Sequence, residues 1–398
     1  MSATPSSPLP PFDAADPLGL DDLLTDEDRA VRDTVRRWAA DRVLPHIAGW
    51  YERGELPGIR DLARELGSLG ALGMSLTGYG CAGASAVQYG LACLELEAAD
   101  SGIRSLVSVQ GSLAMYAIHR FGSEEQKQHW LPRMATGEVI GCFGLTEPDH
   151  GSDPAGMRTH ARRDGSDWVL SGRKMWITNG SVAGVAVVWA ATDDGVRGFV
   201  VPTDTPGFAA PEIHHKWSLR ASVTSELVLD DVRLPADAAL PEVRGLRGPL
   251  SCLSHARYGI VWGSMGAARA SFEAALEYAR TREQFGKPIG GFQLTQAKLA
   301  DMAVELHKGI LLAHHLGLRM DAGRLRPEQV SFGKLNNVRE AIEICRTSRT
   351  ILGANGISLE YPVMRHATNL ESVLTYEGTV EMHQLVLGKA LTGLDAFR

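Results

Sequence analysis

The spacing of apolar residues changes twice along the chain. In residues 20–136, apolar side chains recur at intervals of three and four, the pattern of amphipathic helices. Two capping boxes mark helix starts in this stretch, Thr25 with Asp28 and Ser123 with Gln126. The first third of the chain is therefore predicted to be helical.

Residues 139–245 carry a different pattern. Short runs of β-branched and aromatic residues are bounded by Gly, Asp and Pro, with turn signals about every ten residues. This spacing predicts a small antiparallel β-domain rather than βαβ units. The runs expected to form strands are residues 168–170, 175–178, 185–191, 198–202 and 227–229.

Long helical patterns return in the last part of the chain. Gly-rich strings at residues 286–291 and 353–356 separate these segments. The expected helices are residues 257–280, 293–322 and 327–352, followed by a short helix after Thr379.

These changes predict a multidomain α and β protein in which helical domains flank a β-domain. The expected divisions are a disordered leader (1–19), an N-terminal helical domain (20–138), a central β-domain (139–245) and a C-terminal helical domain (246–398). Residues 1–17 contain no Lys or Arg, unlike a secretory or mitochondrial presequence. A cytoplasmic location is therefore expected.

Composition narrows the function classes. The 398 residues are 44% hydrophobic and 22% charged, as in a soluble globular protein, and no run of about 18 apolar residues predicts a membrane span. The net charge of −7 gives no reason to expect nucleic acid or an anionic membrane as a partner. The five cysteines are scattered without a C-x-x-C pair, so neither a disulfide framework nor a zinc site is expected.

Two apparent motifs are interpreted as coincidences. Gly78 to Gly83 matches G-x-G-x-x-G, but no β-branched run leads into it, as a dinucleotide-binding turn requires. Glu212 and His215 have di-iron spacing without the second such pair that a site needs. No HExxH, P-loop or G-x-S-x-G string occurs, which argues against zinc hydrolysis, ATP chemistry and serine acyl transfer. No metal site is expected.

Four other motifs could carry chemistry. Residues 142–154 place small residues and hydroxyls at the entrance to the β-domain, where they form either a polar turn or a loop that approaches a planar ring and a phosphate. Residues 176–180 end a strand, and Trp176 is either a core residue or the wall of a cofactor site.

The remaining two motifs lie at helix ends. In residues 281–288, Arg282 could bind a pyrophosphate or cap the carbonyl groups of the helix. In residues 375–379, Glu377 precedes a flexible Gly378 and is either an exposed loop acid or a positioned base.

In this order and spacing, the four motifs resemble those of the acyl-CoA dehydrogenase family, over nearly the whole chain. Residues 100–105, 142–152, 256–260 and 369–379 are most similar to the glutaryl-CoA dehydrogenase branch. The resemblance implies an N-terminal α-helical domain, a central β-domain and a C-terminal α-helical bundle, with FAD as cofactor and assembly as a homotetramer. It also implies an acyl-CoA substrate and electron-transfer flavoprotein as the electron acceptor.

The resemblance assigns site residues as well. Glu377 would be the catalytic base, and Arg282, Gln293 and the 352–354 segment would reach FAD from a neighbouring subunit. Substrate contacts are expected from Arg104, Ser105, Ser152, Leu250, Ser251, Cys252, Leu253, Ser254, His255, Ala256, Arg257 and Gly378. FAD contacts are expected from Phe143, Gly144, Leu145, Thr146, Gly151, Ser152, Trp176, Ile177, Thr178, Arg282, Phe285, Gln293, Leu352, Gly353, Ala354 and Thr379.

The function implied by the resemblance is oxidative decarboxylation of glutaryl-CoA to crotonyl-CoA and CO₂. Arg104 with Ser105 would anchor the distal carboxylate, for which a guanidinium is well suited. Burial of Glu377 would raise its pKa and make it an effective base. The alternatives are a dehydrogenase for a short monocarboxylic acyl-CoA, a non-decarboxylating glutaryl-CoA dehydrogenase, and a non-catalytic assembly protein with the same fold.

Overall fold

The computed structural model describes residues 12–14 and 16–396 of the chain. Its first part is helical, as predicted, and both expected capping boxes are confirmed, at Thr25 and at Ser123. A π-helical segment, Val109–Met115, joins α5 to α6. The helices are α1 (Asp26–Arg42), α2 (Ile47–Arg53), α3 (Ile59–Ser68), α4 (Ala86–Ala99), α5 (Ser101–Ser108), α6 (Tyr116–Phe121) and α7 (Glu124–Ala135).

The middle of the chain forms a sheet of seven strands in the described residues, in the order β1-β4-β2-β3-β7-β6 with β5 paired to β4. The expected antiparallel pairing holds except at β4, to which β1 and the first residue of β2 run parallel. The strands are β1 (Gly141–Gly144), β2 (His160–Asp164), β3 (Asp167–Thr178), β4 (Val185–Thr192), β5 (Gly195–Pro202), β6 (Phe208–Ala209) and β7 (Thr224–Leu234).

The last part of the chain is again helical, but a helix at Val363–Thr375 and a short hairpin at residues 283–288 were not among the expected elements. The helix expected to start at Arg257 starts at Arg247, because Pro249 lies in its first turn, where proline is tolerated. The elements are α8 (Arg247–Thr281), the hairpin β8 (Glu283–Gln284) and β9 (Lys287–Pro288), α9 (Gln293–Asp321), α10 (Pro327–Leu352), α11 (Val363–Thr375) and α12 (Val380–Thr392).

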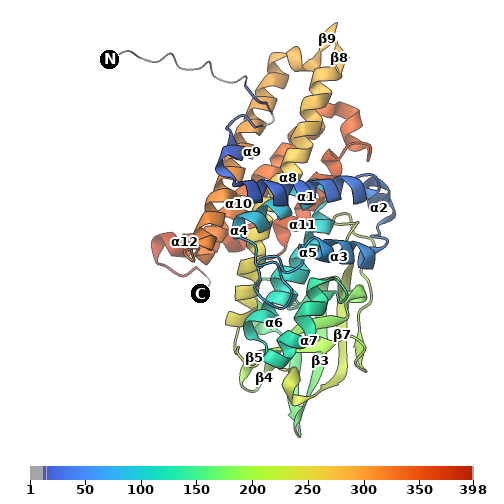
Figure 1. Cartoon of the computed structure of the whole chain (residues 1–398), viewed down its shortest axis with the longest axis vertical. Coiled ribbons are helices and arrows are strands. Elements are labelled where there is room, and N and C mark those ends of the chain that lie inside the picture. The colour runs from blue at the N-terminus through green and yellow to red at the C-terminus, as the bar shows by residue number, and fades with distance from the viewer. Residues whose placement is uncertain (1–11, 15, 397–398) are drawn as a thin grey trace.

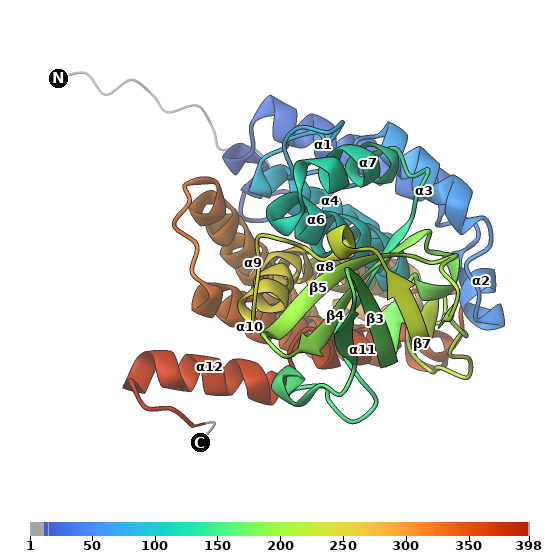
Figure 2. The same cartoon turned by 90° about the horizontal axis from the view of Figure 1, so that it is seen from below.

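The long helix α8 connects the two ends of the molecule. In Figure 1 the sheet lies at the bottom and the β8–β9 hairpin at the top, while α12 projects from one side. In the view from below (Figure 2), α1, α3 and α7 lie on one side of the strands and α11 and α12 on the other. Inside the helical part, the buried Trp262 of α8 donates to the Tyr258 hydroxyl at 2.9 Å, and Tyr258 donates to the Ala86 carbonyl at 2.7 Å. Their polar atoms are therefore satisfied within the core.

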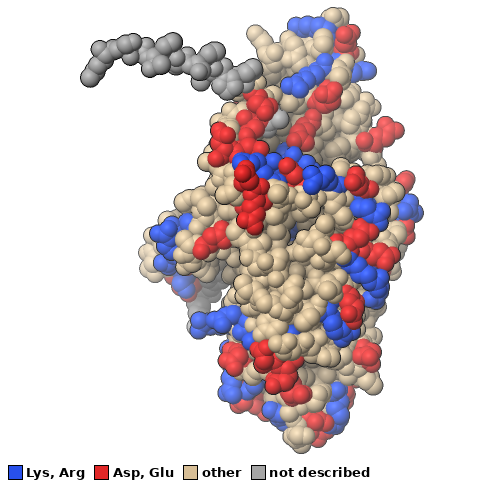
Figure 3. Space-filling model, in the orientation of Figure 1, with Lys and Arg blue, Asp and Glu red and all other residues tan. Residues whose placement is uncertain are grey.

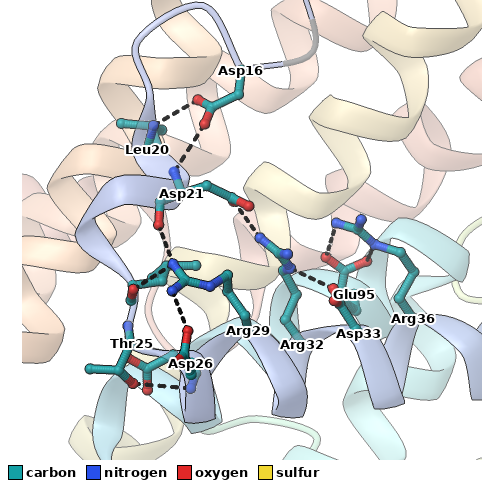
Figure 4. Close-up of polar contacts among 12 residues, drawn as sticks. Asp16, Leu20, Asp21, Thr25, Asp26, Arg29, Arg32, Asp33, Arg36 and Glu95 are labelled. Carbon is teal, nitrogen blue, oxygen red and sulfur yellow. Dashed lines mark hydrogen bonds and ion pairs between the residues drawn. The ribbon is translucent and has the colours of Figure 1, made fainter.

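The segment before α1 is joined to that helix by Arg29, which donates to the Asp21 carbonyl at 2.8 Å, and it is also held by contacts within itself (Figure 4). The Asp16 carboxylate accepts from the backbone amides of Leu20 and Asp21, at 2.7 and 2.9 Å. Arg36 of α1 binds the buried Glu95 of α4 through two hydrogen bonds, and this bidentate pair joins the first helix to the core. Residues 1–11 and 15 of the expected leader lie outside the described residues.

Charges of both signs are mixed over the ends of the face in Figure 3, and the middle of that face is largely uncharged. Among the helices that the structure describes, none is long and apolar enough to cross a membrane.

Candidate active site

The turn between α11 and α12 holds Glu377 in an unusual backbone conformation. α11 ends at Thr375, and the Thr379 hydroxyl caps α12 by accepting from the Met382 amide at 3.3 Å. Between them, Glu377 has a φ of 53° and Gly378 a φ of 101°. A non-glycine residue in the left-handed region is uncommon and persists only where its surroundings hold it.

Two cations, the buried Lys334 and the half-buried Arg257, hold this turn by its carbonyl groups. The Lys334 ammonium of α10 donates to the carbonyls of Tyr376 and Gly378, at 2.5 and 2.6 Å. The Arg257 Nε of α8 donates to the carbonyl between them, that of Glu377, at 2.6 Å. Three successive carbonyl groups are thus fixed from two helices, which explains how the strained turn keeps its shape.

Glu377 is half-buried as a residue, but its Oε2 is buried and has no hydrogen-bond partner among the described residues. Burial raises the pKa of Glu377, while the positive charges of Arg104, Lys334 and Arg257 act in the opposite direction. Burial likewise lowers the pKa of Lys334, against the attraction of Glu377. A buried carboxyl group with a raised pKa and a free oxygen is suited to accept a proton.

Replacing Lys334 with methionine is expected to slow the proton abstraction that the family resemblance assigns to Glu377 by roughly 10²-fold, the scale of a misplaced catalytic group. The variant loses both hydrogen bonds to the turn. It also loses a positive charge near Glu377, so the pKa of Glu377 should rise and the pH profile should shift to higher pH. Stopped-flow flavin reduction across pH measures both effects.

Lys308→Met is the matched control, because Lys308 is an exposed lysine that pairs with Glu305 at 2.8 Å on α9. Lys334→Arg keeps the charge and should recover part of the rate. A Lys334→Met variant with the normal rate and pH profile would contradict the role of Lys334.

Arg104 lies beside this turn in a fully buried position on α5. Its guanidinium donates to the Tyr376 hydroxyl, and its Nε donates to the buried Glu97 of α4 at 2.6 Å. One guanidinium nitrogen, NH1, has no partner in the described part of the chain. Because an unsatisfied buried donor is costly, this nitrogen marks a place where an acceptor would be stabilised. Ser105 is buried next to Arg104 on the same helix.

The pair of Glu97 and Arg104 depends on the absence of a side chain at Gly263 of α8. A Cβ atom there would lie 2.0 Å from Oε2 of Glu97 and 3.2 Å from Nε of Arg104. α8 passes so close to α4 that only glycine leaves room for the carboxylate.

Gly263→Ala is therefore expected to destabilise the protein by about 1–3 kcal/mol, the usual cost of overpacking a core. Denaturant unfolding with FAD bound measures this change. Gly388→Ala is the matched control, since Gly388 lies in α12 with no atom within 4 Å of the added Cβ. Alanine there should stabilise the helix slightly. Equal effects at the two positions would contradict the close-contact argument.

A second buried ion pair shapes the loop that follows β1. Lys174 of β3 binds Glu147 at 2.8 Å and the Leu145 carbonyl at 3.1 Å. Glu147 also accepts from the backbone amides of Arg158 and Thr159, at 2.6 and 2.9 Å. The carboxylate thus folds the loop onto the end of the sheet. Of the residues expected to bind FAD, Phe143, Gly144 and Leu145 are buried here, Thr146 is half-buried, and Gly151 and Ser152 are exposed.

Trp176 stands next to this loop at an irregularity in β3. The register with β7 shifts between Lys174 and Ile177, and Trp176 adopts a φ of 63°. The preceding amide, Met175, donates to the Thr146 carbonyl at 2.8 Å and joins the strand to the loop. Trp176 is 59% exposed, so the bulge turns a large aromatic side chain outward instead of into the core.

The first turns of α8 carry the segment expected to run along the substrate. Cys252 and Ala256 are fully buried in the core shared with the sheet. His255 stacks on Tyr116 with 4.5 Å between ring centroids, and burial lowers the pKa of His255 to about 4. Helical geometry therefore divides residues 250–257 between the core and the outer face of α8, where Leu250 is exposed.

Another group of expected cofactor residues lies at the opposite end of the molecule, around the β8–β9 hairpin (Figure 1). Phe285 is 94% exposed. Asn355, next to the expected 352–354 segment, donates to the Tyr278 hydroxyl at 3.0 Å, which places that segment beside the end of α8. Arg282, Gln293, Gly353 and Ala354 are also exposed, and Leu352 is buried. The chain does not bring this group to Glu377 or Trp176.

Three residues that hold the site were missed from the sequence. Lys334 is a lysine at a helical position shared with Val338 and Ala341, both buried, and a cation in such an apolar stripe could have signalled a special role. Glu97 and Arg104 lie on two helices that are separated by an extended residue, Asp100, so helical spacing could not have indicated their pairing. Lys174 could not have been paired with Glu147 without knowing the sheet.

Comparisons with known proteins cover almost the whole chain. Three family models match it: the acyl-CoA dehydrogenase N-terminal domain over residues 25–138, the middle domain over residues 142–232 and the C-terminal domain over residues 243–392.

Similar solved structures and relatives agree with these models. A glutaryl-CoA dehydrogenase from Mycobacterium smegmatis is 72% identical, with a TM-score of 0.95 over 96% of this chain and 99% of that one. Another, in complex with FADH2, is 66% identical, with a TM-score of 0.94 over 96% and 98%. The mitochondrial short-chain specific acyl-CoA dehydrogenase of Bos taurus is 34% identical over 92% of this chain and 90% of its own length.

Proposed function

Because the chain belongs to the acyl-CoA dehydrogenase family and takes FAD as its cofactor, we propose that it converts glutaryl-CoA to crotonyl-CoA and CO₂. The choice of substrate rests mainly on Arg104, which is buried beside the Glu377 turn. One of its guanidinium nitrogens lacks a hydrogen-bond partner in the described part of the chain and could bind the distal carboxylate. The similarity to glutaryl-CoA dehydrogenases at 72% and 66% identity supports the same choice.

The residues around the loop after β1 fit a flavin. The outward-turned Trp176 offers an aromatic face next to the Thr146 loop, whose shape the Lys174–Glu147 pair fixes. Phe143 to Thr146 with Trp176 to Thr178 would hold the ring system, and Thr379 would contact it from the turn of Glu377. When bound, FAD supplies the two-electron acceptor of the reaction.

Glu377 would remove the α-proton of the thioester, and its free Oε2 would receive that proton. Its own amide would donate to the thioester oxygen, where charge develops as the proton leaves. The hydrogen bonds from Lys334 and Arg257 to the carbonyl groups of the turn fix the position of the Glu377 amide relative to the Glu377 carboxyl group. The raised pKa of Glu377 brings its proton affinity closer to that of the weak carbon acid.

Arg104 would hold the distal carboxylate during oxidation to glutaconyl-CoA. That carboxylate is then vinylogous to the thioester, so the C–C bond can break with loss of CO₂, leaving a dienolate whose protonation gives crotonyl-CoA. Glu377, which holds the proton taken from the α-carbon, would return a proton in this last step.

The main rival is oxidation of a short monocarboxylic acyl-CoA. The 34% identical short-chain relative favours it, and Glu97 already neutralises part of the charge of Arg104. An alkyl tail would nevertheless leave NH1 of Arg104 unsatisfied in a buried place. A non-decarboxylating enzyme would use the same anchor and differ only in the fate of glutaconyl-CoA.

An anaerobic panel of acyl-CoA esters tests the proposal. Flavin bleaching should be fastest with glutaryl-CoA, and carboxyl-labelled substrate should release labelled CO₂. Preference for butyryl-CoA would overturn the assignment. Bleaching by glutaryl-CoA with glutaconyl-CoA as the final product would identify the non-decarboxylating enzyme.

We also propose that the active form is a homotetramer that passes electrons to electron-transfer flavoprotein. The exposed group around Arg282 and Phe285 supports an assembly in which each chain completes the FAD site of a neighbour. The projecting α12 ends with exposed apolar residues, Leu391 and Leu394, which also favour contact with another chain.

Arg282→Ala is expected to lower FAD retention without changing the fold of the chain, because Arg282 is exposed and directly precedes β8, which lies at the end of the molecule opposite the seven-stranded sheet. Gel filtration with flavin absorbance, together with sedimentation velocity, measures retention and assembly. Arg162→Ala, at an exposed position on β2, is the control. A monomer that keeps FAD and full activity would contradict the shared site.

A further inference from the structure

The buried carboxylate of Asp100 joins two helices that are far apart in the sequence. Asp100 caps the start of α5, where its Oδ1 accepts from the Gly102 amide at 2.7 Å. Its Oδ2 accepts from the side chain of Asn369 on α11 at 2.9 Å and from Arg365 of the same helix. Asp100 and Asn369 are fully buried, and Arg365 is 4% exposed. One carboxylate thus connects the N-terminal helical part of the molecule to the C-terminal one.

Residues 218–221, which lie between β6 and β7, bring the third part of the molecule to the same place. The Leu219 amide donates to Oδ1 of Asn369 at 2.8 Å, and Leu219 is held at a φ of 50°. A Cβ atom at Gly102 would lie 2.2 Å from the Ala221 carbonyl oxygen, so this segment also touches α5. We call the whole group the Asp100 junction: Asp100, Gly102, Leu219, Ala221, Arg365 and Asn369.

The hydrogen bonds of the Asp100 junction leave α5 and α11 little freedom to slide. The two oxygens of Asp100 have partners, and so do the amide nitrogen and the amide oxygen of Asn369. A shift of either helix would leave buried polar groups without partners, which is costly. Since α5 and α11 pack against each other in the middle of the molecule (Figure 1), their relative position is set at this point.

Each of these two helices carries one end of the candidate site. Arg104 lies one helical turn after Asp100, and its backbone amide donates to the Asp100 carbonyl at 3.2 Å. Glu377 follows the end of α11, directly after Tyr376, whose hydroxyl accepts from Arg104. The span from the Arg104 guanidinium to Glu377 therefore depends on how α5 is placed against α11.

We propose that the Asp100 junction sets the length of the dicarboxylic acyl chain that the site accepts, by fixing α5 against α11. The inference rests on the proposed function, in which Arg104 binds the distal carboxylate and Glu377 removes the α-proton. Its members are positioning residues, because they act through these two side chains. An acyl chain with one methylene more or less would misplace either its α-carbon or its carboxylate, and a misplacement of about 1 Å can cost roughly 10²-fold in rate.

Asn369→Leu tests the proposal, since leucine is close to asparagine in shape but loses the hydrogen bonds to Asp100 and from Leu219. The measurement is kcat/KM of the FAD-loaded enzyme for glutaryl-CoA and for adipyl-CoA, which is one methylene longer. The wild type should prefer glutaryl-CoA, and this preference should fall by roughly 10-fold in the variant, at the lower end of what one methylene contributes to discrimination. Use of butyryl-CoA, which has no distal carboxylate, should change much less.

Asn337→Leu is the matched control for a general loss of stability. Asn337 is a fully buried asparagine of α10, and its side chain donates to the carbonyls of Val261 and Gly309, both at 2.9 Å. Denaturant unfolding should show comparable destabilisation in the two variants, while only Asn369→Leu changes the preference. Equal falls in preference would assign the effect to general loosening and overturn the proposal. An unchanged preference in Asn369→Leu would overturn it as well.

Asn369→Gln is a second variant that keeps the test valid if Asn369→Leu does not fold. Glutamine keeps the donor and the acceptor but is one methylene longer, so it should move α11 away from α5. The preference should then shift toward adipyl-CoA. A Gln variant with the wild-type ratio of kcat/KM values would count against the Asp100 junction as the determinant of chain length.

A failure of the proposed function would look different. If the wild type reduces its flavin only with monocarboxylic esters, hydrogen exchange followed by mass spectrometry tests the junction without a substrate. Exchange should rise together in α5 and in residues 218–221 in Asn369→Leu, compared with Asn337→Leu. That result would support the coupling of α5 to α11 without supporting the substrate, whereas a rise confined to α11 would overturn the coupling too.

Discussion

Glu377→Gln is expected to keep FAD and CoA-ester binding and to lower the rate of flavin reduction by at least roughly 10²–10⁴-fold, the contribution of a positioned base. Glutamine is nearly the same size, and the contacts of Lys334 and Arg257 involve backbone carbonyls that the change leaves in place. The variant therefore removes the proposed proton acceptor but keeps the hydrogen bonds that hold the turn. Rapid-mixing absorbance of the flavin under anaerobic conditions measures the rate.

Wild-type pH dependence is an independent check on the same residue. The proposed base would act as a carboxylate, so flavin reduction should rise with pH through the pKa of Glu377, which burial raises above its usual value of 4.5. The glutamine variant should lose this rise. Rapid flavin reduction by the variant would mean that another group removes the proton.

Arg104→Gln is expected to lower the preference for glutaryl-CoA over butyryl-CoA by roughly 30-fold to several thousand-fold. Truncating one partner of a buried charge pair costs about 2–5 kcal/mol, at 1.36 kcal/mol per decade of kcat/KM. Butyryl-CoA has no distal carboxylate, so its use should change much less. The ratio of the two kcat/KM values is the measurement.

The contact with Glu97 makes a second variant necessary. Arg104→Gln alone leaves the Glu97 carboxylate buried without a cation, which would destabilise the protein by itself. Arg104→Gln/Glu97→Gln removes both charges and should show the same loss of preference with better stability. Glu97→Gln alone keeps the anchor and should retain the preference. Equal losses on both substrates in the double variant would make Arg104 a structural residue.

Residues near the turn of Glu377 illustrate what the sequence could predict. Glu377, Arg104 and Arg257 come from separate parts of the chain, and each was expected at the site because its local motif resembles the family. The structure brings Arg104 to Tyr376 and Arg257 to Glu377, although their roles stay predictions. Lys334 was not expected, because its role depends on carbonyl groups, which every residue has and no motif records.

The fold was predictable where local physics decides it. The caps at Thr25 and Ser123 and the full extent of α10 follow from side chains close in sequence. The bulge at Trp176 and the parallel pairing of β1 with β4 depend on contacts across the sheet, so periodicity alone could not give them. Runs 168–170 and 175–178, expected as two strands, are one strand for the same reason.

The contacts among Glu97, Arg104 and Gly263 limit the order in which these residues could be replaced as the protein evolved toward another acyl-CoA substrate. Losing Arg104 first would leave the buried Glu97 carboxylate without a cation, which would lower the stability of the protein by about 3–5 kcal/mol. Losing Glu97 first would leave a cation that a dicarboxylate ligand could still neutralise. Only after Glu97 had been replaced could position 263 accept a larger residue, because the space beside α8 is then free. Mutational paths away from the proposed dicarboxylate substrate should therefore begin on α4, and the glycine of α8 should be the last of the three to change.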